Sequence, residues 1–158
     1  MNKDVLIREV TLPEEKITIS REILEALPDW FGIPEAREKY IANSARELFF
    51  AVVEGENPVG FLTLKRTGEA TAELAVMGVR KEYHRRGIGR ALFEAAKVRA
   101  KDAGYVFLQV KTVRMGRYPE YDATNRFYLA LGFREFEVFP TLWDEWNPCQ
   151  IYVMYIGG

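Results

Sequence analysis

A basic loop with two closely spaced glycines, within residues 79–92, is the part of the sequence best suited to bind an anion. Gly87 and Gly89 fall where a strand is expected to lead into a helix, and free N–H groups and the helix dipole at such an end favour negative charge. Residues 80–90 carry a local charge of about +4. Their basic residues are Arg80, Lys81, Arg85, Arg86 and Arg90. The pattern predicts a phosphate site; the alternative is a glycine at a helix start beside a solvated basic surface.

Two common phosphate motifs do not fit this loop. A dinucleotide fingerprint requires a third glycine three residues after Gly89, where Leu92 stands, and a P-loop requires Gly-Lys-Ser or Gly-Lys-Thr, which the sequence lacks. The whole protein has a net charge of -1, so no global basic field attracts nucleic acid. One cysteine, Cys149, and one histidine, His84, cannot build a structural zinc cluster. We therefore expect a local phosphate site, no nucleic-acid partner and no metal.

Two motifs together resemble the GNAT superfamily of N-acetyltransferases. Residues 84–89, His84-Arg85-Arg86-Gly87-Ile88-Gly89, resemble that family's pyrophosphate loop, Gln/Arg-x-x-Gly-x-Gly/Ala, with His84 in the first position. Residues 125–133, which read Asn-Arg-Phe-Tyr-Leu-Ala-Leu-Gly-Phe, resemble the family's helix that ends in Tyr-x-x-x-Gly-Phe. The order of elements from residue 5 to 156 also resembles that fold.

The resemblance implies an acetyl-CoA site. The pantetheine arm would bond to the backbone of the strand at residues 71–79, and the phosphates would lie on the amides of residues 85–90. The implied cofactor-binding residues are Met77, Val79, Arg85, Arg86, Gly87, Ile88, Gly89, Arg90 and Asn125. His84 is expected to be a loop contact rather than a base.

Two residues are candidates for proton transfer. The resemblance places Glu73 where some family members carry a catalytic glutamate, and alternation puts it on the same strand face as Met77 and Val79. Glu73 is therefore the predicted base, with a solvated strand residue as the alternative. A base matters for lysine-like acceptors, because an amine with a pKa near 10.4 is neutral in only about one molecule in a few thousand at pH 7. The resemblance implies that Tyr128 lies over the CoA sulfur as the general acid; the alternative is a core tyrosine.

Two aromatic loops are candidates for the acceptor side. The resemblance implies that the loop holding Trp30 and Phe31 and the loop of residues 142–149 border the acceptor cleft. In the second loop, Trp143 with the acids Asp144 and Glu145 could hold a cationic amine by charge and cation-π contact. The alternative is that these indoles cover one end of the sheet or form a homodimer contact, with the acids as a solubilising rim.

The elements that must position these residues alternate between strands and helices. Apolar patterning predicts strands at residues 5–10, 48–53, 59–65, 71–79, 105–113, 133–140 and 150–156, with 48–79 as an antiparallel meander. A first helix is predicted to follow a polar break at residues 13–16 and to end at Pro28. Three more helices are predicted at residues 34–43, 87–102 and 122–131. The prediction is α+β: one domain over residues 1–158, about seven strands in a mixed, mostly antiparallel sheet with four helices. The resemblance adds a cleft where strands 71–79 and 105–113 splay apart.

Length and composition complete the prediction. A chain of 158 residues with 48% hydrophobic and 28% charged residues is a packed domain rather than a disordered chain. The amino end meets charge after three apolar residues, so we expect neither export nor a membrane span, and a cytoplasmic location. The predicted protein is an N-acetyltransferase that transfers the acetyl group of acetyl-CoA to a primary amine of a small molecule or a protein. The amine attacks the thioester directly in a ternary complex. The alternative is a non-catalytic acyl-CoA-binding module.

Overall fold

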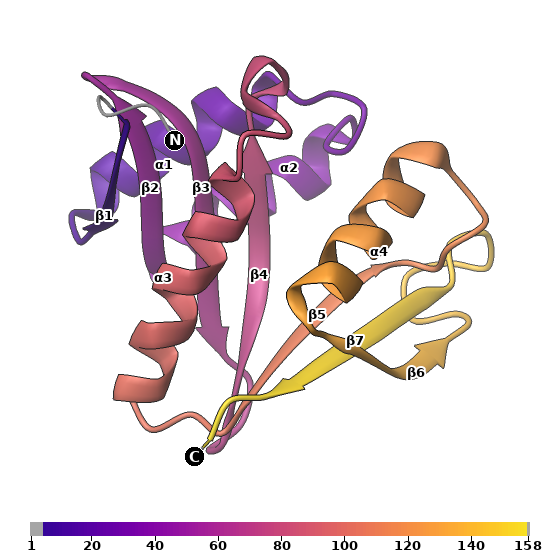
Figure 1. Ribbon diagram of the computed structural model, residues 1–158. Coiled ribbons are helices and arrows are strands. Elements are labelled where there is room, and N and C mark those ends of the chain that lie inside the picture. The colour runs from indigo at the N-terminus through magenta and orange to yellow at the C-terminus, as the bar shows by residue number, and fades with distance from the viewer. Residues whose placement is uncertain (1–4, 158) are drawn as a thin grey trace.

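One seven-stranded sheet runs through the chain in the computed structural model, which describes residues 5–157 (Figure 1). In spatial order the strands are β1 (Val5–Val10), β2 (Leu48–Glu54), β3 (Asn57–Arg66), β4 (Thr71–Val79), β5 (Phe107–Val113), β7 (Cys149–Tyr155) and β6 (Arg134–Phe139). All neighbours are antiparallel except β4 and β5, which are parallel. The predicted α+β class and the antiparallel meander over β2, β3 and β4 are confirmed.

Helices cover both faces of the sheet, and each face has its own core (Figure 1). The helices are α1 (Pro13–Glu25), α2 (Pro34–Ser44), α3 (Ile88–Asp102) and α4 (Pro119–Leu131), with a short 3-10 turn, η1 (Lys81–Tyr83), before α3. Ile23 and Leu24 of α1 fill the core on one face, whereas Leu92 and Phe93 of α3 fill the core on the other. We call these the α1/α2 face and the α3/α4 face.

Two helices begin earlier than the sequence predicted. The polar break predicted at residues 13–16 is wrong, because Pro13 opens α1; likewise α4 starts at Pro119 and not at Asp122. Proline suits the first turn of a helix, since its fixed φ is already helical and its missing N–H would have no intrahelical acceptor there. Gly132 ends α4 in the left-handed region, with φ of 110°, as its position in the sequence suggested.

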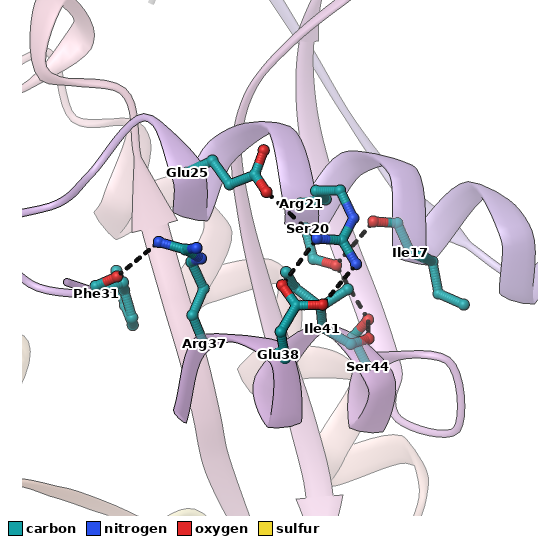
Figure 2. Close-up of polar contacts among 9 residues, drawn as sticks. All are labelled: Ile17, Ser20, Arg21, Glu25, Phe31, Arg37, Glu38, Ile41 and Ser44. Carbon is teal, nitrogen blue, oxygen red and sulfur yellow. Dashed lines mark hydrogen bonds and ion pairs between the residues drawn. The ribbon is translucent and has the colours of Figure 1, made fainter. Parts of the chain in front are cut away.

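Contacts between α1 and α2 join the two helices on either side of the loop that connects them (Figure 2). Arg21 donates two hydrogen bonds of 2.8 Å to the carboxylate of Glu38, and the buried hydroxyls of Ser20 and Ser44 lie 3.2 Å apart. The exposed ion pair contributes little to stability, so the buried apolar contacts around Ile41 supply most of the attachment.

Strands β4 and β5 pair along only part of their length. Their register joins Thr71 to Phe107, Ala72 to Leu108 and Glu73 to Gln109, and no pair follows. Both strands continue, β4 to Val79 and β5 to Val113, and they diverge in space (Figure 1). The divergence leaves part of each strand without a neighbour on that side, and it agrees with the splay of these two strands that the resemblance implied.

Candidate active site

The open edge of β4 presents backbone hydrogen-bonding groups to the gap between β4 and β5. Arg80 donates its N–H to the carbonyl of Val59 in β3, at 2.9 Å. Residues of an antiparallel strand alternate between bonding to the neighbour and pointing away from it. The N–H and C=O groups of Val79 and Met77 therefore point away from β3, into the gap. An extended ligand can bond to them as an added strand would.

A β-bulge in β4 moves Glu73 to the opposite face from Met77 and Val79. In the register with β3, Leu74 pairs with Leu64 and Val76 with Thr63, so Ala75 is an extra residue. Met77 and Val79 lie on the α3/α4 face, whereas the register puts Glu73 on the α1/α2 face with Val76. The prediction that Glu73 shares a face with Met77 and Val79 is wrong, because the simple alternation on which it rested is interrupted by the bulge.

The loop from β4 to α3 presents a run of free amides. Within the described chain, the backbone N–H groups of residues 85–90 donate no hydrogen bond; the first amide of the helix that does is that of Ala91, to the carbonyl of Gly87 at 3.0 Å. Gly87 has φ of 78°, which favours glycine, and Arg85 also has a positive φ, of 63°. The amide groups expected from the sequence are therefore available to an anion at this helix end.

Gly89 allows close packing between three elements of the site. A Cβ at this position would lie 3.0 Å from Cζ of Phe127 in α4 and 3.8 Å from the terminal methyl of Met77. The structure thus brings the start of α3 against β4 and α4, and the two sequence motifs meet at this point.

The positive charge of the loop is smaller than the sequence suggested. Arg80 approaches Glu22 at 3.5 Å, and Lys81 binds Asp29 at 2.5 Å. These pairs reduce the local charge of about +4 to about +2, because two acids from α1 and the following loop lie beside the basic residues. Two of the three remaining cations also have contacts: Arg86 lies over the ring of Tyr83, and Arg90 donates to the carbonyl of Ala130.

His84 anchors this loop. Its Nε2 lies 2.6 Å from the carbonyl oxygen of Val79, so Nε2 carries a proton and donates. The ring of Trp30 meets the imidazole edge to face, with centroids 5.8 Å apart. The indole N–H of Trp30 donates to the carbonyl of Glu120, and Tyr121 donates to the carbonyl of Trp30. The α1–α2 loop therefore contacts both sides of the gap, the end of β4 and the start of α4.

Tyr128 combines a core ring with a free hydroxyl. Its ring packs against Phe133 and Tyr152, and only 6% of the residue is exposed. Within residues 5–157 its hydroxyl forms no hydrogen bond with another protein group, whereas the hydroxyl of Tyr152 donates to Asn125. Burial, with a smaller contribution from the phenol of Tyr40, raises the pKa of Tyr128 well above its ordinary value. The phenol therefore keeps its proton at neutral pH and can donate it to a bound group.

Glu73 is buried and paired, not solvated. The Nζ of Lys111 in β5 lies 3.0 Å from Oε1 of Glu73. The Glu73 side chain is 8% exposed, and the Lys111 side chain is 30% exposed. The pair bridges β4 and β5 beside the last residues that they pair. The alternative of a solvated strand residue is wrong. Lys111 was missed, although a lysine within the apolar strand around residues 107–113 was a usable signal.

Asn125 is a structural residue, so the prediction that it bonds the pantetheine arm is wrong. It is fully buried, and its Nδ2 donates to the carbonyls of Val113 and Tyr121 at 2.8 and 2.7 Å. Its Oδ1 accepts from the hydroxyl of Tyr152 at 2.5 Å. Each polar atom is used within the protein, and the side chain joins α4 to β5 and β7.

The second aromatic loop is only partly suited to an acceptor. Asp144 accepts from the backbone N–H groups of Trp146 and Asn147, both at 2.8 Å, and from the side-chain amide of Asn147. The bond from the Asn147 side chain, followed by the two backbone bonds, lowers the pKa of Asp144. The carboxylate of Asp144 thus holds a turn, and its contact with a cationic acceptor beside Glu145 stays a prediction. Trp143 and Glu145 remain exposed, and so does Trp146, which suits either an acceptor or a protein contact.

Other chemically reactive groups do not form a second centre. Burial raises the pKa of the Cys149 thiol to about 11, so this thiol stays protonated, as expected for a buried small residue. In the described chain, no three His, Cys, Asp or Glu side chains converge where they could hold a metal ion. Within residues 5–157, no helix has both the length and the apolar character needed to cross a bilayer.

The diverging parallel strands, the free amides at the start of α3 and the unbonded Tyr128 hydroxyl define an acyltransferase type of architecture. Residues 45–135 match the sequence profile of the acetyltransferase (GNAT) domain, which is more than half of the chain. The chain therefore belongs to the GNAT family of acetyltransferases, and the resemblance inferred from the two motifs is confirmed.

Solved structures show the same fold. A protein assigned to the GNAT family of acetyltransferases from Desulfovibrio desulfuricans superposes with a TM-score of 0.81 and 20% identity, over 96% of this chain and 99% of that chain. The ribosomal-protein-S18-alanine N-acetyltransferase from Escherichia coli superposes with a TM-score of 0.76 and 19% identity, over 97% of this chain and 96% of that chain. A GNAT family acetyltransferase from Elizabethkingia anophelis with acetyl-CoA bound superposes with a TM-score of 0.72 and 15% identity, over 98% of this chain and 99% of that chain. A search of curated proteins gives no match.

Proposed function

We propose that this protein is an acetyl-CoA-dependent N-acetyltransferase that acetylates a primary amine by direct attack in a ternary complex. The observation that carries the proposal is the continuity of free backbone groups, from the open edge of β4 to the amides of residues 85–90. An extended arm that ends in a pyrophosphate matches this sequence of groups. Membership of the GNAT family and the acetyl-CoA bound to the related structure from Elizabethkingia anophelis support it.

Acetyl-CoA would lie with its pantetheine arm along β4 and its pyrophosphate at the start of α3. The N–H groups of Met77 and Val79 would bond the arm, while the Val79 carbonyl is already held by His84. Arg85, Arg86, Gly87, Ile88, Gly89 and Arg90 would supply amides to the phosphates. The residual positive charge of the loop favours the same ligand.

Tyr128 would serve the leaving group. In direct attack, the amine nitrogen forms a bond to the thioester carbonyl carbon, and the C–S bond then breaks as the thiolate departs. The Tyr128 hydroxyl, which has no partner in the described chain, donates its proton to that sulfur and is reprotonated from solvent. Its raised pKa keeps the proton in place until the thiolate forms.

Glu73 would serve the attacking amine from the α1/α2 face. The amine must lose one proton, and Glu73 is a buried carboxylate at the base of the gap on that face. Lys111 already pairs with this carboxylate, so the ammonium of the acceptor would share Glu73 with Lys111, and proton transfer would be left to solvent. The proton would therefore pass from the amine to water beside Glu73.

A melting and turnover experiment tests the proposal against a binding module without activity. CoA should raise the melting temperature, because a ligand that binds only the folded protein stabilises it. With acetyl-CoA and a panel of amines, free thiol and acetylated amine should then appear in equal amounts. A CoA-dependent melting shift without any acetylated product would favour the acyl-CoA-binding module, and no shift at saturating CoA would contradict both.

A further inference from the structure

The Glu73–Lys111 ion pair lies on the side of the sheet from which an acceptor would approach. The pantetheine arm would lie in the plane of the sheet along the backbone of Met77 and Val79, whereas the side chain of Glu73 projects from the α1/α2 face. In direct attack, the amine approaches one face of the planar thioester carbonyl, whereas the sulfur of the departing thiol lies in that plane. An amine that enters from the α1/α2 side therefore passes the point where β4 and β5 separate, beside this pair.

The charges of the pair restrict which amines fit. Most amines arrive as ammonium ions, and Glu73 already has one cation, Lys111, 3.0 Å away. A second cation alone would face Lys111 in a site of low polarity, where repulsion between like charges is strong. A carboxylate on the same acceptor removes this difficulty, because the lysine ammonium has three N–H donors and can bond a second oxygen.

We propose that the acceptor is a free α-amino acid whose ammonium binds Glu73 and whose carboxylate binds Lys111, an inference that rests on the N-acetyltransferase function above. An α-amino acid carries both groups on one carbon, so they can reach two side chains that are themselves in contact. Peptide amino termini, polyamines and simple amines lack the adjacent carboxylate.

The rings of Phe31 and Tyr40 provide a surface for the side chain of the amino acid. Their centroids are 5.9 Å apart in an edge-to-face arrangement, and Tyr40 is partly exposed. Burial and, to a smaller extent, the charge of Glu73 raise the pKa of Tyr40. An apolar side chain is expected to be preferred at this surface.

The reaction with an amino acid balances without a further reactant. The α-ammonium loses one proton to water, and the neutral amine bonds the acetyl carbon; the nitrogen then releases a second proton to water. The C–S bond breaks, the thiolate takes a proton from Tyr128, and the Tyr128 phenolate recovers a proton from water. The products are an N-acetyl amino acid and CoA with a free thiol, and the amino-acid carboxylate remains on Lys111 throughout.

Matched acceptors test the inference. The common L-amino acids would be compared with their α-carboxamides and with the amines that lack the carboxylate, for example phenylalanine, phenylalaninamide and phenethylamine. A carboxamide lowers the basicity of the α-amine, so a larger fraction of the amide than of the amino acid carries a neutral amine at neutral pH. Without the protein, the amide would therefore react faster. We expect kcat/KM for the best amino acid to exceed that of its amide at least about 30-fold, a preference that the protein must supply.

Two variants separate the ion pair from the general charge of the site. Lys111→Met should reduce the acid-to-amide preference to about threefold or less, and the double variant Glu73→Gln with Lys111→Met, which leaves no unpaired buried charge, should do the same. Lys65→Met is the matched control, because Lys65 pairs in register with Glu73 but is exposed. It should keep the preference of the unmodified protein.

The outcomes separate this inference from the proposed function. Turnover of amides or simple amines as fast as of amino acids would overturn the inference and leave the N-acetyltransferase function in place. An equal loss of preference in Lys65→Met would also overturn it. A melting shift with CoA but no turnover of any acceptor would overturn both the inference and the enzymatic function, and the absence of a shift would overturn CoA binding as well.

Discussion

Replacing Tyr128 with phenylalanine removes the proposed proton donor and leaves the ring in place. Loss of a general acid typically lowers the rate by about 10²- to 10³-fold, equivalent to about 3–4 kcal/mol of transition-state stabilisation. The Tyr128 hydroxyl bonds to no other group in the described chain, so its removal should change the free energy of unfolding by less than about 1 kcal/mol. We therefore expect a large loss in kcat, an unchanged KM for acetyl-CoA and an almost unchanged melting temperature.

The matched control is Tyr152→Phe. Tyr152 is equally buried, but its hydroxyl donates to Asn125, and the variant leaves that oxygen without a donor. The expected cost is about 1–3 kcal/mol, or a fall of about 3–10 °C in melting temperature, with a kcat much closer to that of the unmodified protein. The assays are thiol release at saturating substrates and thermal unfolding. A kcat of Tyr128→Phe within about threefold of the unmodified protein would refute the assignment of the general acid.

Three further perturbations have expected outcomes. Gly89→Ala should weaken CoA binding about tenfold or more, because its Cβ would meet Phe127 at 3.0 Å; Gly68→Ala, in open space, is the control, and equal affinities in titration calorimetry would contradict the reasoning. Asn125→Leu should lower the melting temperature by several degrees without raising the KM for acetyl-CoA selectively; a selective rise would restore Asn125 as a ligand. Burial raises the pKa of Glu47 in the folded protein. The contribution of Glu47 to the free energy of unfolding is therefore fully present below the ordinary carboxyl pKa, and it is lost as the pH rises through the raised pKa. Glu47→Gln should therefore melt higher than the unmodified protein at pH 7.5, with a difference that shrinks towards pH 4, and a constant difference would contradict it.

The sequence predicted the parts of the fold and site that depend on local pattern. The strands, the glycine turn before α3 and the tyrosine motif of α4 lie within short segments whose periodicity or turn residues are visible directly. The same local signals placed the free amides of residues 85–90, because a helix start leaves such groups wherever it occurs.

The errors concern contacts between segments that are distant in the chain. The bulge at Ala75 depends on the register of β4 with β3, and it reversed the face of Glu73. Asn125 looked like a ligand until its partners on β5 and β7 were known, and Lys111 gained importance only through its pairing with Glu73. The turn around Asp144 is local, and an Asp three residues before Asn147 could have indicated it.

The central claim is that acetyl-CoA lies along the open edge of β4 with its pyrophosphate on the amides of residues 85–90. Amide NMR of the ¹⁵N-labelled protein during a CoA titration tests this directly, since each N–H group reports its own contact. The largest shifts are predicted at Met77, Val79 and residues 85–90, with little change at β1, on the far edge of the sheet. Binding without shifts in residues 85–90, or with shifts confined to other segments, would contradict the claim.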